Sequence, residues 1–275
     1  MVKVKITKPL NNRQFMAGAW VFGLIFLFSI AAPIITRYHP DALESPVATR
    51  YLAPSLQHFF GTDQFGRDVF SRVLFGGRIS LLIALMVVVC AVTFGTFYGA
   101  VSGYAGGFVD QILMRFVDAL LAFPVIFLAV TLMALWGVGL KWLIVILIVS
   151  SWMEVARVVR AEVLSLKQRP FILKAYAAGL HSSRIFFRHL LPNTFTTILT
   201  VAVLRAADVL LSESALSFLG LGVQPPTASW GTILNDGKAV LATAWWITAF
   251  PGLIIVATVM SFNLIGEGLR AWRNM

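Results

Sequence analysis

The sequence has 275 residues, of which 59% are hydrophobic and only 12% are charged. Soluble domains carry about 25% charged residues, so this composition excludes a soluble domain and indicates an integral membrane protein. The net charge of +10 does not indicate nucleic-acid binding, because the basic residues lie mainly at the ends of apolar runs, which is typical of membrane topology.

Five or six apolar windows along the chain are long enough to cross a bilayer, whose core takes about 20 residues of helix. The first window could also be a secretory signal, but its apolar run is longer than usual and no polar cleavage region follows it, so we expect a span. The fourth window is short, and the third contains Pro124. The windows predict an all-α, polytopic membrane bundle of about six transmembrane helices: Met16–Ile35, Ile79–Ser102, Ile112–Met133, Leu140–Val155, Thr197–Leu219 and Trp245–Leu264.

The distribution of lysine and arginine predicts the orientation, because these residues gather in short cytoplasmic loops. The segment 156–194 is rich in both, whereas residues 220–244 contain only Lys238. We therefore expect 156–194 and both termini in the cytoplasm and 220–244 outside. The resulting divisions are a cytoplasmic tail at 1–14, a first transmembrane helix at 15–36, an external segment at 37–78 and a core transmembrane domain at 79–275, which includes the coupling loop 156–194.

The external segment 37–78 contains several arginines, which the rule for cytoplasmic loops does not favour. Its acidic residues, Glu44 among them, offset most of that charge. We expect Arg67 to Gly77 to form a short amphipathic helix at the outer interface. Four apolar residues would dip into lipid or protein there: Val69, Phe70, Val73 and Leu74.

The cytoplasmic segment FILKAYAAGLHSSRIFFRHLLPN, residues 171–193, predicts a short helix. Pro170 suits the first helical position, and Gly179 suits the left-handed residue that closes a helix. Ser182 and Ser183 can cap a second helix, which Pro192 would end. A helix of about nine residues is marginal alone in water. Its apolar residues therefore predict support from a partner protein: Phe171, Leu173, Ala175 and Ala178.

Four ionisable residues inside the windows are functional candidates, because burying charge in a membrane is costly. Asp118 lies one helical turn after Arg115 and can pair with it. Arg205 and Asp208 are three residues apart and can also pair. Glu213 has no basic partner on its own helix, so we expect it to meet another subunit or to face a water-filled path. Structural pairing and lining of a translocation pathway both explain Asp118, Arg205, Asp208 and Glu213.

The segment SFLGLGVQPPTASWG, residues 217–231, leaves the fifth window through glycines and two prolines. Such backbone does not remain helical in lipid. We expect it to be packed in protein or to line an aqueous cavity at the outer face.

The sequence offers no site for chemistry. The nearest approach to a phosphate-binding loop, residues 231–239, is one residue too long and has Ala239 where serine or threonine is needed. Four scattered histidines and one cysteine lack metal-ligand spacing: His39, His58, His181, His189 and Cys90. We therefore expect no enzyme activity, bound cofactor or metal site in this chain, and any ATPase must be a separate protein.

Several ordered motifs resemble the inner-membrane permease subunits of bacterial ABC importers for dipeptides, oligopeptides and nickel, specifically the second, C-type permease of the pair. They are FGTDQFGRDVFSR at 60–72, MRFVDALLAFP at 114–124, the AAG…LLPN loop at 177–193 and SFLGLGV..P...WG at 217–231. The family's loop typically begins Glu-Ala-Ala, and Leu173 stands where that glutamate would be. The resemblance therefore implies docking through the helix without a salt bridge from this position.

The resemblance implies the type I importer fold in the bacterial inner membrane. It also implies four kinds of partner: a homologous permease in a heterodimer, two ATPase subunits that hold ATP and magnesium, an external solute-binding protein, and membrane lipid; no nucleic acid is implied. The residues implied for ATPase docking are Ala175, Tyr176, Ala177, Ala178, Gly179, Leu180, His181 and Ser182. The residues of the external motif are Gly61, Thr62, Asp63, Gly66, Arg67 and Asp68.

Peptides are the cargo that the motifs favour, with nickel or a metal chelate second. A secondary transporter is the alternative that needs no motor, but it would usually show two matched halves with broken helices. A membrane-embedded enzyme would need a convergent catalytic set of residues.

Overall fold

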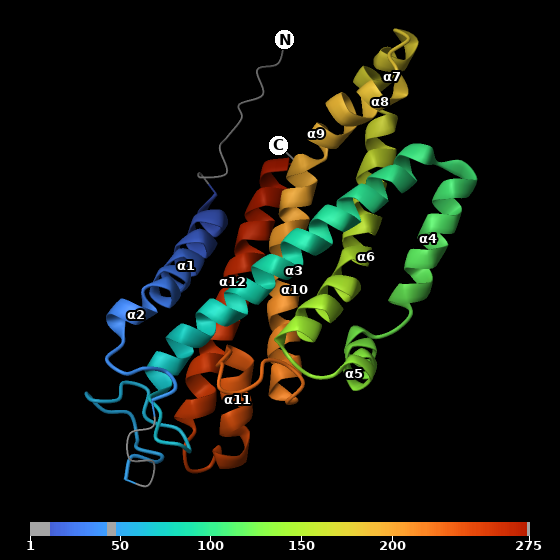
Figure 1. Ribbon diagram of the computed structural model, residues 1–275. Helices are drawn as coiled ribbons and strands as arrows, with labels where there is room; N and C mark the ends of the chain where they lie inside the picture. The colour runs from blue at the N-terminus through green and yellow to red at the C-terminus, as the bar shows by residue number, and fades with distance from the viewer. Residues whose placement is uncertain (1–11, 43–47, 274–275) are drawn as a thin grey trace.

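The computed structural model describes residues 12–42 and 48–273 (Figure 1). Most of the tail expected at 1–14, and Glu44, therefore lie outside the described residues. The long helices are α1 (Arg13–Ile30), α3 (Val69–Ala105), α4 (Gly107–Leu121), α5 (Val125–Trp136), α6 (Leu140–Lys167), α10 (Phe195–Phe218) and α12 (Trp246–Arg273). The short ones are α2 (Ala32–Ile35), α7 (Pro170–Ala177), α8 (Ser182–Ile185), α9 (Leu191–Asn193) and α11 (Trp230–Gly237).

The helices confirm the prediction of an all-α, polytopic membrane bundle. Among the described residues, five helices are long and apolar enough to cross a membrane, and α4 with α5 makes up to six if that bent pair counts as one span. The bundle has two distinct ends. Helices α7 and α8 project from one end, and α11 lies at the opposite end (Figure 1).

The third predicted span is broken, so the continuous helix expected over Ile112–Met133 is wrong. Helix α4 ends at Leu121, α5 begins at Val125, and the two helices are bent by 81°. The break coincides with Pro124, which cannot donate a backbone hydrogen bond and disfavours helix in the residue before it.

The amphipathic helix expected at Arg67–Gly77 is not a separate element. Residues 69–77 form the first turns of α3, a helix of 37 residues, with Asp68 as its N-cap. Val69, Val73 and Leu74 are buried in protein. The helix continues through the pair Gly76-Gly77, which lets other parts of the chain pack closely against it: a Cβ atom on Gly77 would lie 2.4 Å from Ser29 Oγ.

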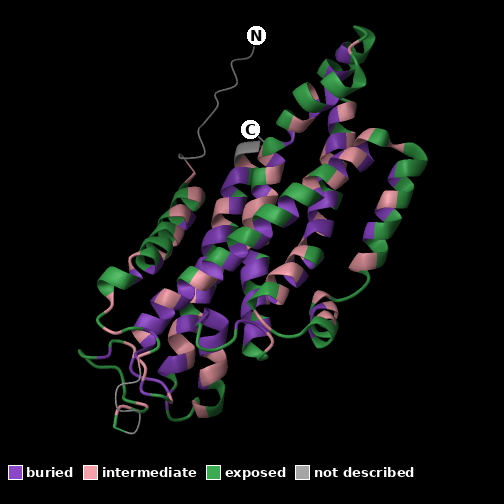
Figure 2. Ribbon diagram, in the orientation of Figure 1, coloured by how far each residue is buried: buried purple, intermediate pink, exposed green. Residues whose placement is uncertain are grey.

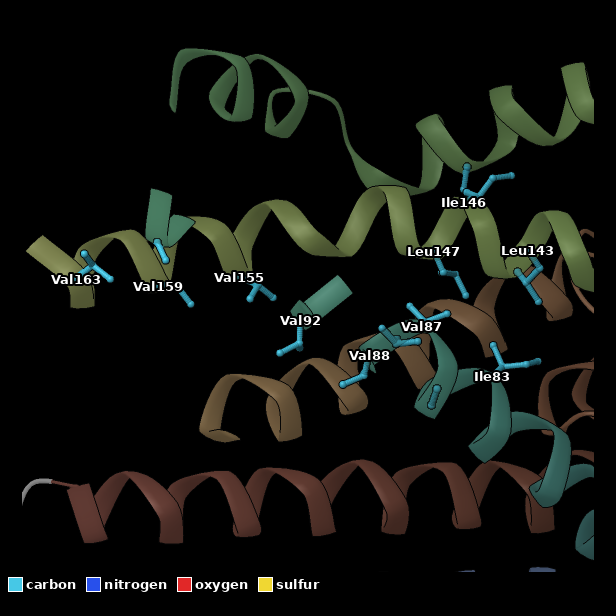
Figure 3. Close-up of a cluster of buried hydrophobic side chains, with 14 of the residues drawn as sticks. Ile83, Val87, Val88, Val92, Leu143, Ile146, Leu147, Val155, Val159 and Val163 are labelled. Atoms are coloured by element: carbon cyan, nitrogen blue, oxygen red, sulfur yellow. The ribbon is translucent and has the colours of Figure 1, made fainter. Parts of the chain in front are cut away.

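The main core lies between α3 and α6. Figure 3 shows Ile83, Val87 and Val88 of α3 next to Leu143 and Leu147 of α6, whereas Ile146 points to the opposite side of α6. Three glycines spaced four apart on α3 bring the two backbones together: a Cβ atom on Gly99 would lie 2.1 Å from the Ala156 carbonyl oxygen, and Gly95 and Gly103 are similarly crowded. This is the small-residue pattern of membrane helix packing. Helix α1 instead packs on α12 and remains largely exposed (Figure 2).

Candidate functional site

The segment 170–193, which we expect in the cytoplasm, begins with a helix that the sequence predicts well. Helix α7 starts at Pro170, and Gly179 has φ +71°. The Leu180 N–H donates to the Ala175 carbonyl (3.2 Å), and the Gly179 N–H donates to the Tyr176 carbonyl (3.0 Å). These two bonds form a Schellman motif, which requires a left-handed residue at this position. The predictions for Pro170 and Gly179 are confirmed.

The second half of this segment differs from the prediction. The N-cap of α8 is His181, whose Nδ1 accepts from the Ser183 N–H at 3.4 Å, instead of Ser182 or Ser183. Pro192 does not end the helix either. A π-helical turn, Phe186–Leu190, follows α8, and Pro192 lies in the short helix α9, which continues directly from that turn.

Helix α7 has one face supported by its own chain and one face uncovered. Ile172 and Ala175 are buried in the core cluster that includes Ile185 and Leu190. This corrects the expectation that Ala175 contacts a partner. Phe171 and Leu173 point outward, 44% and 53% exposed. Six of the other expected docking residues, Tyr176, Ala177, Ala178, Gly179, His181 and Ser182, are also exposed, and Leu180 is half-buried.

Tyr104, near the end of α3, ties this segment to the transmembrane bundle. Its hydroxyl donates to the Ser182 carbonyl (3.1 Å), and its ring packs edge-on against Phe186. Lys167, the last residue of α6, donates to the Tyr104 carbonyl (2.9 Å). Burial and the hydrogen bond with Tyr104 raise the pKa of Tyr176 to about 12. The segment is therefore held by the ends of two spans.

At the opposite end, the external motif forms a buried network of charges. The Asp63 carboxylate is fully buried and accepts from Arg67 Nε (2.7 Å) and Arg72 Nη1 (2.6 Å). Arg72 also donates to Asp236 of α11 (2.8 Å). Asp68 contacts His58 Nδ1 (3.0 Å) and caps α3.

The remaining motif residues fix the backbone around this network. Gly61 and Gly66 have positive φ, and a Cβ atom on Gly61 would lie 2.6 Å from the Leu52 carbonyl oxygen. The Thr62 carbonyl accepts from Trp246 Nε1 (3.1 Å). The motif therefore joins the outer segment to α3, α11 and α12.

The charged residues inside the spans find partners that the sequence did not predict. Asp118 pairs with Arg157 of α6 instead of Arg115. Arg205 does pair with Asp208 (3.2 Å), as expected, but it also pairs with Glu154 of α6.

Glu213 corrects the expectation of a partner subunit or a water-filled path. Its side chain is completely buried within this chain, where it accepts hydrogen bonds from Ser80 (3.1 Å) and Ser217 (2.8 Å). The segment 217–231 that follows is packed in protein only in part: residues 228–231 are buried, and Trp230 Nε1 donates to the Val73 carbonyl (2.9 Å), whereas residues 218–220 and 224–227 are exposed.

Sequence reasoning missed Glu154 and did not assign Arg157 to the span. The window that ended at Val155 made Arg157 and Arg160 look like loop residues, whereas α6 continues to Lys167. Arg160 donates from Nε (2.6 Å) and Nη2 (2.5 Å) to Asp110 of α4. The signal was the spacing of Glu154, Arg157 and Arg160, which puts them on one helical face.

Comparisons with known proteins agree with this architecture. The family described as "Binding-protein-dependent transport system inner membrane component" matches residues 91–273, and "N-terminal TM domain of oligopeptide transport permease C" matches residues 10–54. The dipeptide transport system permease protein DppC of Bacillus subtilis is 38% identical over 94% of this chain and 81% of its own. The oligopeptide transport system permease protein OppC of the same organism is 37% identical over 94% of this chain and 85% of its own.

A solved structure shows the same fold. A chain of the MetNI methionine ABC transporter, in inward-facing conformations, superposes with a TM-score of 0.62 at 17% identity and covers 74% of this chain and 95% of that chain. The first family model spans residues 91–273, and the two Bacillus subtilis relatives are similar to this chain along most of its length. The chain therefore belongs to the binding-protein-dependent inner-membrane components, the permease subunits of ABC importers.

Proposed function

We propose that this chain is one of the two permease subunits of a bacterial importer that moves di- or oligopeptides across the inner membrane. One observation carries the proposal. Helix α7 is closed by a Schellman motif, held by Tyr104 and Lys167, and presents the exposed Phe171 and Leu173 away from its own core. A rigid helix with an uncovered apolar face is suited to dock in a groove of another protein.

The partners follow from this assignment. Two ATPase subunits hold ATP and magnesium, and one of them grips residues 176–182 on the cytoplasmic side, where both termini of the chain also lie. A homologous permease completes the pathway, and an external solute-binding protein meets the segments 37–78 and 220–244. Nucleotide binding closes the ATPases and moves α7, and the spans then rock between inward-open and outward-open states.

Peptides are the cargo that the relatives favour. Both Bacillus subtilis relatives are named for dipeptide or oligopeptide transport. Nickel or a metal chelate, the alternative drawn from the motifs, is not favoured by these names.

Purification through a tag on this chain tests the proposal. We expect an ATP-hydrolysing protein to co-purify, and proteoliposomes of the complex with its solute-binding protein to take up dialanine only with ATP. Leu173→Asp should weaken co-purification of the ATPase, because the carboxylate would be buried at the docking face. Leu241→Asp is the matched control, since Leu241 is equally exposed (54%) but lies just after α11, at the other end of the bundle. Dialanine uptake driven by a proton gradient without ATP would contradict the proposal.

A further inference from the structure

Five charged side chains from three helices form a chain of alternating sign across the bundle. Asp118 of α4 pairs with Arg157 of α6, and Glu154 of α6 pairs with Arg205 of α10, which also contacts Asp208. Glu154 and Arg157 are three residues apart on α6, so they lie on the same face. In the order Asp118, Arg157, Glu154, Arg205, Asp208, each charge is therefore next to one of opposite sign. We call these five residues the charge ladder.

The charge ladder is more exposed than the neighbouring ion pair between Asp110 and Arg160. The Asp110 side chain is only 10% exposed, and it receives two hydrogen bonds from Arg160 and one from Ser102 (2.5 Å). In the ladder, by contrast, the side chains of Asp118, Asp208 and Arg157 are 58%, 54% and 53% exposed. Uncovered charges at this depth do not face hydrocarbon, because that costs several kcal/mol each. They face water, the partner permease or a charged ligand.

The chemistry of the ladder selects its ligand. A naked divalent cation is not suited, because the two arginines repel it and it offers them no negative charge in return. Consistently, the described residues contain no group of three or more His, Cys, Asp or Glu that could hold a metal. A zwitterion finds partners for both of its ends: its ammonium pairs with an aspartate, and its carboxylate pairs with an arginine.

The spacing also fits. Glu154 and Arg157 are separated by about 4.5 Å along the helix axis at 1.5 Å per residue. The termini of an extended dipeptide are about 7 Å apart. Its two ends can therefore reach neighbouring rungs of opposite sign at the same time.

We propose that the ladder is the peptide-binding part of the translocation pathway, where an acidic residue such as Asp208 receives the free amino terminus of a peptide and a neighbouring arginine of the ladder, Arg205 or Arg157, receives its free carboxyl terminus. This inference rests on the proposed function and specifies its cargo as zwitterionic peptides with free termini. As the peptide moves, each of its charged ends pairs with successive ladder residues of opposite sign, so neither end is left without a counter-ion.

Two neutralising variants in the reconstituted transporter test the ladder. For dialanine, N-acetyl-dialanine and dialanine amide, the number of peptides moved per ATP hydrolysed is measured in each variant and divided by the wild-type value. The solute-binding protein is the same in both, so its selectivity cancels in this ratio. Loss of one charge-assisted contact lowers transport by about tenfold. We expect Asp208→Asn to slow the two peptides with a free amine and to spare N-acetyl-dialanine. We expect Arg157→Gln to slow the two peptides with a free carboxylate and to spare the amide.

Arg115→Gln is the matched control, because Arg115 is an exposed arginine of α4 outside the ladder; it should leave all three rates unchanged. Equal slowing of all three peptides by both variants would assign the charges to subunit assembly and overturn the ladder. Unchanged rates in both variants would overturn it as well. Wild-type proteoliposomes that move none of the three peptides with ATP would overturn the proposed function itself, and the cargo assigned here with it.

Discussion

Burial and partners, more than residue type, decide what each charged side chain does in this chain. Glu213 and Asp208 are both acids of α10, yet one is completely buried among serines and the other is half exposed on the charge ladder. The sequence identifies both as ionisable residues within a span. It does not reveal their environments, because the neighbours Ser80 and Glu154 come from other helices.

Glu213 is expected to serve the fold. Glu213→Gln keeps a carbonyl oxygen that accepts from Ser80 and Ser217, so its melting temperature in detergent should stay close to that of the wild type. Glu213→Leu leaves these buried hydroxyls without their acceptor, at about 1–3 kcal/mol for each unsatisfied group, and should melt clearly lower. Equal melting of the leucine variant and the wild type would show that the hydrogen bonds do not stabilise the chain.

Gly179 is expected to serve the docking helix. A Cβ atom there meets nothing within 4 Å, so the cost of a substitution comes from its φ of +71°. Gly179→Val should strain the Schellman motif by about 1–2 kcal/mol and uncouple uptake from ATP hydrolysis, with membrane insertion unchanged. Gly179→Asn is the control, since asparagine tolerates this conformation and should transport nearly normally. Normal peptide uptake by the valine variant would count against the docking role.

At the scale of elements, local chemistry predicted where spans exist better than where they end. Hydropathy located the windows, and Pro170 and Gly179 located α7. The ends of α3 and α6 were missed because long-range packing extends both helices: Asp68 caps α3 within the buried outer network, and Arg160 is neutralised by Asp110 of α4. The partners of Asp118 and Glu213 were missed for the same reason, since contacts between helices leave no local pattern in the sequence.

Tyr104 is expected to transmit movement between α7 and the spans. Tyr104→Phe removes the hydrogen bond to the Ser182 carbonyl and keeps the ring against Phe186, so ATP hydrolysis should continue with less peptide moved per ATP. Tyr98→Phe is a matched control on α3, because the Tyr98 hydroxyl donates to the Leu113 carbonyl (3.0 Å), outside the cytoplasmic segment. The same peptide-to-ATP ratio in both variants would remove the coupling role of Tyr104.

At the scale of the whole molecule, α3 connects the two functional ends. Its first turns hold the outer network through Asp68 and Arg72, and its last turn holds the cytoplasmic segment through Tyr104. A helix of 37 residues is about 55 Å long, well beyond the hydrocarbon core. Helix α3 can therefore link events at the outer face to the docking helix as one rigid element.

The outer network predicts an order of stability among two variants. Asp63→Ala leaves Arg67 and Arg72 without a fully buried counter-ion and should destabilise by about 3–5 kcal/mol. Asp236→Ala removes a partner that is partly exposed, while Asp63 still neutralises both arginines, so the loss should be smaller. Thermal unfolding in detergent measures the order, and a lower melting temperature for Asp236→Ala than for Asp63→Ala would contradict this account of the network.

The central claim is that α7 docks on an ATPase in the cytoplasm, and site-specific photo-crosslinking tests it most directly. A photoreactive amino acid at position 173, illuminated in intact membranes, should form an adduct with an ATP-hydrolysing protein, whereas the same group at position 241 should not. Adducts with lipid alone from position 173, or labelling of residues 171–185 by a reagent applied only from outside the cell, would contradict the account.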